Sequence, residues 1–575
     1  LRRGRNARTY FKLASGVSSE VVNQKIFEYT RTTYPDYQGD PYFIINFADY
    51  YLESLYENGK PAGGRIELIR LFIVIGILVL LIACINFMNL STARATLRMK
   101  EIGVRKTMGA LRSSLISQFL TESFIISSLA GLTACCLMFI LFPLFEKILG
   151  QPIQFSSDFK LISALLGIIL FTGLAAGSYP ALFLSGFNPL KVLKGTFVAS
   201  SNGQWFRKGL VVFQFGISLA LIIGVVVIYQ QMNYVQTKSL GYDNEYIINF
   251  RTTGMSGSKQ EAFLSEVNKI TGVVKASGIS HSLFGAQRSG SNITWNGKDP
   301  EQEVWFEYGN VGYHMLELLG IELIEGRFFS KEFGNDETKI VINQSTKKLM
   351  GLENAVGEKF TLNESDFEII GVTNDFHFQS LHEPIKPTFF LLNNNNWYLK
   401  LAIKIQPDRI RETLVEVDEL YSQLNPGFPF EYSFHDQDQT EMYETEVKVG
   451  SLIKYAAGLA ILISSLGLFG LVSFITEQKS KEMGIRKVLG ASSASIFKAL
   501  SKDFIIPMLI AAIAGVLASA LQINKWLDEF AYRIELKGWF FAGAISVMVL
   551  ISLITAIPQV LKTVLANPID ALRDE

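Results

Sequence analysis

The sequence lacks the residues from which several kinds of soluble protein are built. Only three cysteines occur among 575 residues, Cys84, Cys135 and Cys136, and all three lie in apolar segments. Thiols in such segments pack as small hydrophobic side chains. The polar segments therefore have no cysteine for a disulfide or a Cys-based metal site. The 53 Lys and Arg balance the 53 Asp and Glu, which gives no indication of a nucleic-acid partner.

Common catalytic and nucleotide-binding motifs are also missing from the sequence. There is no GxxxxGK[ST] phosphate loop, no HExxH pair and no GxSxG elbow. Asp375, His377 and His382 lie close together, but their spacing is a weak metal pattern and fits ordinary loop histidines better. We expect no catalytic, cofactor or metal site on this chain.

What the sequence does contain is long apolar runs. A helix needs about 20 apolar residues to cross the hydrocarbon core of a bilayer. Seven runs meet this length, and none has Asp, Glu, Lys or Arg near its middle, which argues against an ion-coupled transporter. The runs cover 66–90, 115–145, 160–184, 209–231, 452–476, 503–522 and 538–561.

The distribution of Lys and Arg predicts the orientation of these spans. Segments 91–114, 185–208 and 477–502 are rich in basic residues, which favours a cytoplasmic location. Links 146–159 and 523–537 are poorer in basic residues and contain Asp or Glu. Seven crossings that begin outside agree with every loop, so residues 1–65 and 232–451 are predicted outside and the C-terminus inside. The expected location is the inner membrane of a bacterium.

Residues 232–451 have the pattern of a soluble α+β domain. Short apolar alternations at 246–250, 339–343 and 367–372 predict strands. Segments near 258–269, 312–319 and 407–424 predict helices, with turn residues between them. The expected fold class is therefore a polytopic α-helical membrane protein that carries an extracytoplasmic α+β domain.

An internal repeat divides the chain into two related halves. Residues 100–110 read KEIGVRKTMGA and residues 481–491 read KEMGIRKVLGA, with seven of eleven positions identical at an offset of 381. Tyr179-Pro180 and the segment 188–193 recur, at nearly the same offset, as Ile557-Pro558 and 567–572. Each half should contain one span, an outside domain and three further spans. By this symmetry we expect that about 180 residues, with an eighth span, precede Leu1.

This duplicated pattern resembles the MacB/FtsX-type family of ABC transporter permeases. The outside domain also resembles the MacB-like periplasmic core, through Gly312-Tyr313, Gly326-Arg327-Phe328, 341–343, Val356-Gly357 and 370–372 in that order. The ending 567–573 resembles the family's C-terminal tail. The resemblance implies the following domains: 1–65, the tail of a first core domain; 66–200, three FtsX-like spans; 201–231, the first span of the second half; 232–451, a second core domain; and 452–575, three further FtsX-like spans.

The resemblance also implies how the chain would be driven. MacB carries a fused ATPase domain, and this sequence has no phosphate loop, so a separate ABC ATPase subunit is the expected partner. On a helix, Glu101 and Glu482 share a face with Arg105 and Arg486, four residues later. The resemblance makes these segments coupling helices that dock on the ATPase. The predicted coupling residues are Lys100, Glu101, Gly103, Arg105, Lys106, Gly109, Lys481, Glu482, Gly484, Arg486, Lys487 and Gly490.

The sequence is compatible with two functions of such a permease. The first is export or extraction of a peptide, drug or lipoprotein, for which the large MacB-like core is modest support. The second is FtsX-like signalling or mechanotransmission, in which the outside domain regulates an extracytoplasmic partner. Besides the ATPase and the lipid bilayer, a periplasmic adaptor or substrate protein is an expected partner, and nucleic acid is not.

Overall fold

The computed structural model places most of the chain in two compact units. One unit comprises residues 1–221, 452–515 and 547–575, and the other comprises 222–451 and 516–546. Four long helices pass from one unit into the other. The structure describes residues 10–33, 42–50, 52–53, 55–57, 60–63, 65–97, 99–149, 159–185, 201–280, 288–299, 304–393, 397–441 and 443–565.

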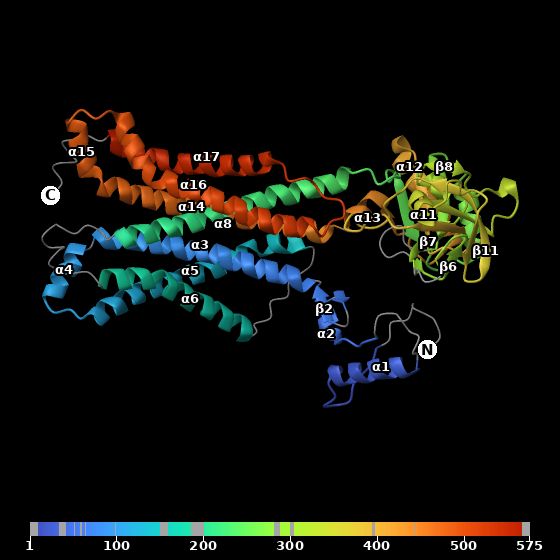
Figure 1. Ribbon diagram of the computed structural model, residues 1–575, viewed down its shortest axis with the longest axis horizontal. Coiled ribbons are helices and arrows are strands. Elements are labelled where there is room, and N and C mark those ends of the chain that lie inside the picture. Colours follow the sequence, from blue (N-terminus) through green and yellow to red (C-terminus); the bar gives the residue numbers. More distant parts are fainter. Residues whose placement is uncertain are drawn as a thin grey trace. The chain divides into compact units, whose positions relative to one another are not determined.

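Among these residues, seven helices are long and apolar enough to cross a membrane, as predicted (Figure 1). They are α3 (Arg65–Leu97), α5 (Arg112–Leu149), α6 (Phe159–Ser185), α8 (Ser201–Thr237), α14 (Glu444–Gln478), α16 (Ser493–Leu527) and α17 (Gly538–Leu565). Helix α8 continues six residues beyond 231, where we expected the span to end. The predicted polytopic helical class is confirmed.

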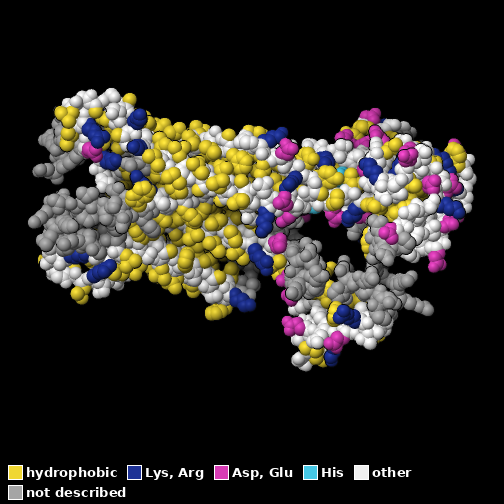
Figure 2. Space-filling model, viewed as in Figure 1, with side chains coloured by type: hydrophobic (Ala, Val, Ile, Leu, Met, Phe, Trp, Pro, Cys, Tyr) yellow, Lys and Arg dark blue, Asp and Glu magenta, His cyan; other side chains and the backbone are white. Residues whose placement is uncertain are grey.

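The long helices expose much of their apolar surface. Between 6% and 50% of each spanning window is buried, and Figure 2 shows hydrophobic side chains over the outer faces of these helices. Exposure of so large an apolar surface to water is unfavourable, whereas contact with lipid hydrocarbon is not. The fold is therefore that of a membrane protein, in agreement with the prediction.

Small residues bring some of the long helices close together. A Cβ atom on Gly173 would lie 3.3 Å from the Phe124 Cα, and one on Gly177 would lie 2.7 Å from the Ser123 Cβ, so both glycines allow α6 to approach α5. A Cβ on Gly216 would lie 3.7 Å from the Ala511 carbonyl oxygen. Gly224, eight residues later on α8, has no described neighbour within 4 Å.

The α+β domain (residues 247–441) is built on one mixed sheet. The strand order is β14-β3-β13-β4-β7-β12-β9-β11-β10-β6, with β5 beside β7 and β8 beside β11. The strands are β3 (Ile247–Arg251), β4 (Val273–Ile279), β5 (Arg288–Gly290), β6 (Ile293–Trp295), β7 (Phe306–Val311), β8 (Leu323–Gly326), β9 (Lys339–Asn343), β10 (Lys359–Leu362), β11 (Ser365–Thr373), β12 (Thr388–Leu392), β13 (Lys400–Ile405) and β14 (Tyr432–Phe434). The three predicted strands correspond to β3, β9 and β11.

Helices pack on this sheet through aromatic and aliphatic side chains. Phe263 of α9 and Tyr421 of α12 join Phe250 of β3 in one buried cluster. The helices are α9 (Gly257–Val267), α10 (Met315–Leu318), α11 (Gln344–Met350), α12 (Ile410–Leu424) and α13 (His435–Glu441), with 3-10 turns η1 (Lys331–Phe333) and η2 (Pro407–Arg409). The predicted helix near 312–319 is shorter than expected. The α+β class of this domain is confirmed.

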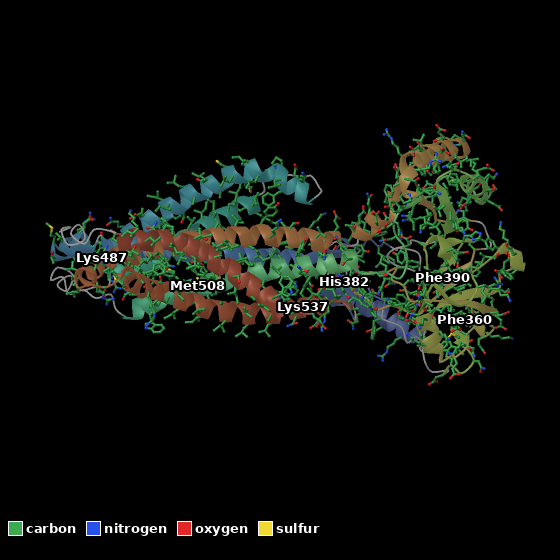
Figure 3. All side chains as sticks on the ribbon, turned by 90° about the horizontal axis from the view of Figure 1, so that it is seen from above. Phe360, His382, Phe390, Lys487, Met508 and Lys537 are labelled. Carbon is green, nitrogen blue, oxygen red and sulfur yellow. The ribbon has the colours of Figure 1, made fainter. Side chains whose placement is uncertain are left out.

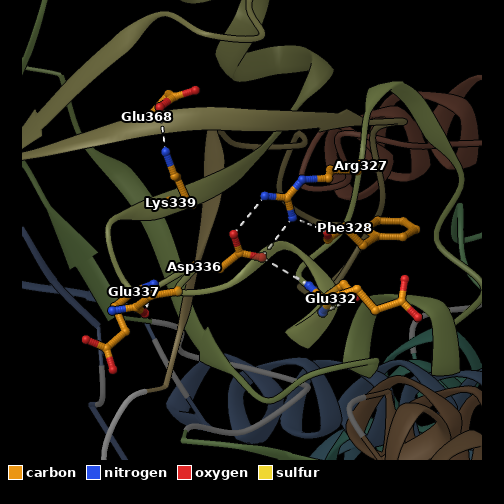
Figure 4. A network of polar contacts seen from close by, with 9 residues as sticks. Arg327, Phe328, Glu332, Asp336, Glu337, Lys339 and Glu368 are labelled. Carbon is orange, nitrogen blue, oxygen red and sulfur yellow. Dashed lines mark hydrogen bonds and ion pairs between the residues drawn. The ribbon is translucent and has the colours of Figure 1, made fainter.

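Gly326 and Arg327, two of the motif residues named in the sequence, hold loops of the α+β domain. Both outer nitrogens of the Arg327 guanidinium donate to Asp336 at 2.8 Å, and the Ser330 N–H donates to the same carboxylate at 3.0 Å (Figure 4). The bond from Arg327, more than the attraction of its charge, lowers the pKa of Asp336. Gly326 has a φ of +76° where its backbone passes the Ile370 carbonyl, which leaves no room for a Cβ.

Shorter elements complete the described chain. Before α3 lie α1 (Ser19–Thr33), α2 (Phe47–Tyr50) and the antiparallel pair β1 (Leu55–Glu57) and β2 (Lys60–Gly63). Two nine-residue helices, α4 (Met99–Thr107) and α15 (Ser480–Val488), follow α3 and α14. We call α4 and α15 the elbow helices, because each joins two long helices.

Candidate coupling site

The first elbow helix, α4, is a short basic helix with an ion pair on its exposed side. Arg105 Nη2 donates to Glu101 Oε1 at 2.6 Å, one turn earlier in the helix. Both side chains are about half exposed, at 49% and 55%. An exposed pair of this kind contributes roughly 0.3–0.5 kcal/mol, so it orients the charges more than it stabilises the fold.

The second elbow helix, α15, repeats this arrangement atom for atom. Arg486 Nη2 lies 2.6 Å from Glu482 Oε1, and the two side chains are 49% and 51% exposed. The ion pairs predicted from the four-residue spacing are therefore present in both halves. Their role in coupling stays a prediction.

Both elbow helices end in the same way, at a glycine with a positive φ. Gly109 has a φ of +97° and Gly490 a φ of +90°, in a region that glycine enters without a steric penalty. The Gly109 N–H donates to the Lys106 carbonyl and the Gly490 N–H to the Lys487 carbonyl, each at 3.1 Å. Such a cap satisfies the last carbonyls of a helix and lets the chain turn sharply into the next long helix.

A lysine ties each elbow helix to the end of another long helix. Lys106 Nζ donates to the Ser185 carbonyl oxygen at 2.7 Å, at the last residue of α6. Lys487 Nζ donates to the Val564 carbonyl oxygen at 2.9 Å, near the end of α17. A lysine near a helix C-terminus interacts favourably with the carbonyl end of the helix dipole. The sequence repeat identified both lysines, but only the structure shows what they bind.

Each elbow helix also has a buried face and an exposed apolar face. Gly103 and Gly484 are buried, beside Ile102 (5% exposed) and Met483 (4% exposed). Two apolar side chains four residues apart are exposed at the end of each elbow helix instead, the second directly after its last residue: Val104 (46%) with Met108 (83%), and Ile485 (51%) with Leu489 (80%). The sequence analysis did not predict these exposed apolar pairs. Their spacing of four residues, repeated at equivalent positions of the two halves, could have indicated them.

Some predicted residues lie outside what the structure describes. The side chains of Lys100 and Lys481 are among them, although both residues belong to the elbow helices. The repeated segments 188–193 and 567–572 also lie outside the described residues. Of the other predicted coupling residues, the glutamates, the arginines and the end glycines are exposed at equivalent positions of the two elbow helices, whereas Gly103 and Gly484 are buried.

A second site joins the α+β domain to the ends of the long helices that belong to the same unit. We call it the junction. It consists of Gln231, Lys238, His377, Leu381, His382, Tyr443, Glu446, Phe530 and Tyr532. Sequence analysis did not predict it, because its residues come from four separate segments.

His382, labelled in Figure 3, has partners on α14 and in the segment after α16. Its Nδ1 lies 3.1 Å from the Glu529 carbonyl oxygen and its Nε2 lies 3.2 Å from Glu446 Oε1. The ring stacks on Phe530, with centroids 3.8 Å apart. Burial lowers the pKa of His382, but the bonds to Glu446 and to the Glu529 carbonyl outweigh burial, and the net shift is upward.

The rest of the junction fixes the loop between α16 and α17. The Gln231 amide donates to the Tyr532 carbonyl at 3.0 Å and accepts from the Ile534 N–H at 2.9 Å. The Tyr532 ring meets the His377 ring edge-on at 4.5 Å, and Lys238 Nζ lies 3.7 Å from the Tyr532 ring centroid. Burial, with a smaller contribution from Lys238, lowers the pKa of His377 to about 4.

The weak metal pattern noted in the sequence is not a cluster in the fold. Asp375 accepts hydrogen bonds from the backbone N–H and the hydroxyl of Ser345, whereas His382 bonds to Glu446. Within the described ranges, no group of three His, Cys, Asp or Glu side chains could hold a metal ion.

Comparison with protein families shows which family has the elbow helices and the α+β domain. The model of the FtsX-like permease C-terminal domain matches residues 73–189 and again 455–568, once around each elbow helix. The model of the MacB-like periplasmic core domain matches residues 210–421. The chain belongs to the MacB/FtsX-type family of ABC transporter permeases. The predicted resemblance is confirmed, and the α+β domain is the periplasmic core of this permease.

Individual relatives agree with this assignment. The chain is 32% identical over 157 residues to the macrolide export ATP-binding/permease protein MacB of Bdellovibrio bacteriovorus, covering 27% of this chain and 23% of that protein. It is 21% identical over 301 residues to the pyoverdine export ATP-binding/permease protein PvdT of Pseudomonas aeruginosa, covering 48% and 44%. The chain thus spans less than half the length of these curated relatives.

Solved structures give a weaker likeness. The periplasmic region of MacB from Actinobacillus actinomycetemcomitans is similar at 15% identity and a TM-score of 0.26, covering 35% of this chain and 94% of that one. The extracellular domain of the noncanonic ABC-type transporter YknZ from Gram-positive bacteria is similar at 16% identity and a TM-score of 0.25, covering 32% and 97%.

Proposed function

We propose that this permease couples ATP hydrolysis on a separate ABC ATPase subunit to movement of its periplasmic core domain. The elbow helices carry the proposal. Each presents an ion-paired arginine beside two exposed apolar side chains, at equivalent positions of the two halves. Two equal docking surfaces suit an ATPase that works as a pair of identical subunits.

The chain would bind the ATPase through α4 and α15 on the cytoplasmic side. There the exposed apolar pairs would be buried in a pocket of the ATPase, and the arginines would set the orientation. Buried apolar anchors beside oriented charges are the usual source of affinity and specificity at an interface. Binding of ATP, its hydrolysis and the nucleotide site belong to the partner in this proposal, and the chain needs no cofactor of its own.

The junction would pass the motion to the core domain. The loop between α16 and α17 and the beginning of α14 both bond to residues 377–382, so displacement of these helix ends would move the domain with them. Movement of this domain would then export or extract a substrate. The relatives named above export a macrolide or pyoverdine, and for this chain the substrate class proposed is a peptide, drug or lipoprotein.

The first test is co-purification of the full chain from its native membrane. We expect an ATPase with a phosphate loop to accompany the wild type and to be lost from the Arg105→Glu, Arg486→Glu double variant. The matched control is Lys359→Glu with Arg411→Glu, which reverses two exposed charges on the core domain and should leave the ATPase bound. Retention of the ATPase by the elbow variant would contradict docking through α4 and α15.

A second test addresses orientation. In a background without native cysteines, Met108→Cys directly after α4 and Phe333→Cys on the core domain introduce thiols at positions that are 83% and 63% exposed. A membrane-impermeant maleimide should label the second thiol in cells with a permeable outer membrane. It should label the first only after the inner membrane is broken. The opposite pattern would place the elbow helices outside and remove them from reach of an ATPase.

An FtsX-like signalling subunit is the alternative within the same family. It would use the same elbow helices and junction, so the two functions differ in what the core domain meets. If an accessory periplasmic protein binds the core domain and changes its own activity with the ATP cycle, the chain is a signalling subunit. If instead a cargo molecule is released from the membrane, export or extraction is correct.

A further inference from the structure

Helices α3 and α14 occupy equivalent places in the two halves, residue by residue. They end at Leu97 and Gln478, and the elbow helices after them begin at Met99 and Ser480. The next long helices, α5 and α16, begin at Arg112 and Ser493. All three pairs of positions differ by 381, the offset of the sequence repeat. Nothing is therefore inserted or deleted across this stretch, and the equivalence extends back along both helices.

The two helices meet at equivalent positions. A Cβ atom added to Gly467 on α14 would lie 2.8 Å from Asn86 Oδ1 on α3, and residues 86 and 467 are separated by that same offset of 381. One turn further, a Cβ on Gly470 would overlap the Leu90 side chain. Each helix thus meets the other at its own equivalent position, which is where an axis relating the two halves must pass.

The residues that meet are not alike, however. Helix α3 carries Asn86 and Asn89 where α14 carries Gly467 and Gly470. Side chains of one helix fill the space left by glycines of the other, as small residues at membrane helix interfaces allow. Two copies of α3 at this spacing would press Asn86 against Asn86. Two copies of α14 would leave a gap between bare backbones. Only the mixed pair fits.

Polar groups reinforce the mixed pair. Gln214 Nε2 of α8 would lie 3.0 Å from the same Cβ position on Gly467, so its amide and that of Asn86 converge there. The Gln214 side chain is 98% buried, and neither its Nε2 nor Asn86 Oδ1 has a hydrogen-bond partner. Unpaired polar groups are costly away from water. The space over Gly467 lets a donor and an acceptor approach each other or share a water. Beside it, the Ser218 and Ser464 hydroxyls lie 2.8 Å apart and join α8 to α14.

We propose that α3 and α14 form a mixed interface that joins the two halves of one chain and rejects a second copy. Asn86 and Leu90 are the projecting residues, Gly467 and Gly470 form the receiving surface, and Gln214 closes it from α8. One chain would then supply both halves of the permease. A single chain would also offer both docking surfaces to one pair of ATPase subunits. This last step alone rests on the proposed function.

The test is cross-linking of the full chain in its membrane. In a background with Cys84, Cys135 and Cys136 replaced by alanine, Asn86→Cys and Gly467→Cys are introduced together and oxidised. We expect a disulfide that links residues 86 and 467, identified by mass spectrometry, in a product of single-chain size. Copies with two different tags, expressed together, should not become linked to each other. This result does not depend on any ATPase. The mixed interface can therefore be wrong while the proposed function is right, and the proposed function can be wrong while the mixed interface is right.

The single-cysteine variants test rejection of a second copy. Neither Asn86→Cys alone nor Gly467→Cys alone should give a covalent dimer. A dimer from Asn86→Cys alone would show two α3 helices together and would overturn the proposal. So would a disulfide of the double variant that joins differently tagged chains.

A stability measurement supports the test without cysteines. Gly467→Leu should lower the thermal unfolding midpoint of the full chain in detergent by about 5 °C, the scale expected for overpacking, and adding Asn86→Gly should restore part of it. Gly458→Leu is the matched control on the same helix, because Gly458 has no described neighbour within 4 Å. Equal midpoints for Gly467→Leu and Gly458→Leu would contradict close contact at Gly467.

Discussion

The two halves of this permease are nearly identical at the elbow helices and different where α3 meets α14. At the elbows, the ion pair, the anchoring lysine, the glycine cap and the exposed apolar pair all recur at the same offset. At the crossing, Asn86 and Leu90 of α3 face Gly467 and Gly470 of α14. Identical surfaces suit a partner made of two identical subunits. Surfaces that must recognise each other within one chain benefit from being different, because difference excludes the wrong pairing.

The largest expected effect on binding comes from changing the two elbow helices one at a time. Arg105→Glu and Arg486→Glu, made separately, should each weaken ATPase binding at least about tenfold, or roughly 1.4 kcal/mol. Each places a second negative charge beside its partner glutamate, and like charges at an interface oppose docking. The measurement is titration of the purified ATPase against each variant in lipid nanodiscs. A large loss from one variant and none from the other would show that the halves are not equivalent.

The core domain and the elbow helices should also differ in how their stability depends on pH. The five histidines of this sequence lie from residue 281 to residue 435, in the core domain, so the side chains that ordinarily titrate near neutrality are found there. The pKa of His377 is lowered to about 4, below the ordinary 6.5 of the unfolded chain. The folded state then binds fewer protons, and stability falls as pH drops from about 6.5 to 4, by on the order of 3 kcal/mol.

His382 opposes this trend. Its raised pKa means that its contribution is fully present below the unfolded value and is lost as pH rises through the folded value. Thermal unfolding of the full chain between pH 4 and 8 measures both effects. His377→Phe, which keeps a ring edge against Tyr532, should remove part of the loss at low pH, whereas His382→Gln should not. The rest of that loss is expected from His435, because burial lowers its pKa to about 3. An unchanged acid profile in His377→Phe would disprove the assignment.

A smaller effect is expected at the elbow glycines. Gly109→Ala and Gly490→Ala should each cost about 1–2 kcal/mol locally, because alanine is strained at their positive φ. A Cβ at either site would meet no described atom within 4 Å, so the cost is conformational and should be the same in both halves. Hydrogen exchange of residues 99–110 and 480–491 measures it. Gly76→Ala, in the middle of α3, is the control and should have no such effect.

The smallest expected effect concerns the exposed ion pairs. Glu101→Gln and Glu482→Gln should destabilise their elbow helices by only about 0.3–0.5 kcal/mol each, and about 1 M salt should abolish the difference. Hydrogen exchange at low and high salt is the measurement. A loss well above 1 kcal/mol in either helix would mean that the pair is a structural element and not an oriented surface charge.

Much of the architecture could be predicted from the sequence because it depends on local patterns. Runs of apolar residues are enough to indicate seven spans, and alternation identified β3, β9 and β11. The repeat and the four-residue spacing of Glu101 and Arg105 predicted both elbow ion pairs. These features depend on residues a few positions apart, whose geometry in a helix or strand is fixed in advance.

Contacts between distant segments depended on the tertiary structure. His382 meets Glu529 across 147 positions, and β12 pairs with both β7 and β9 in an order that alternation does not specify. The repeat aligns Asn86 with Gly467, but that they touch is decided by how α3 crosses α14. The sequence by itself determined the spans, the duplication and the charged face of each elbow helix. Only the tertiary structure decided the junction and the mixed interface, because packing, and not periodicity, selects which distant side chains meet.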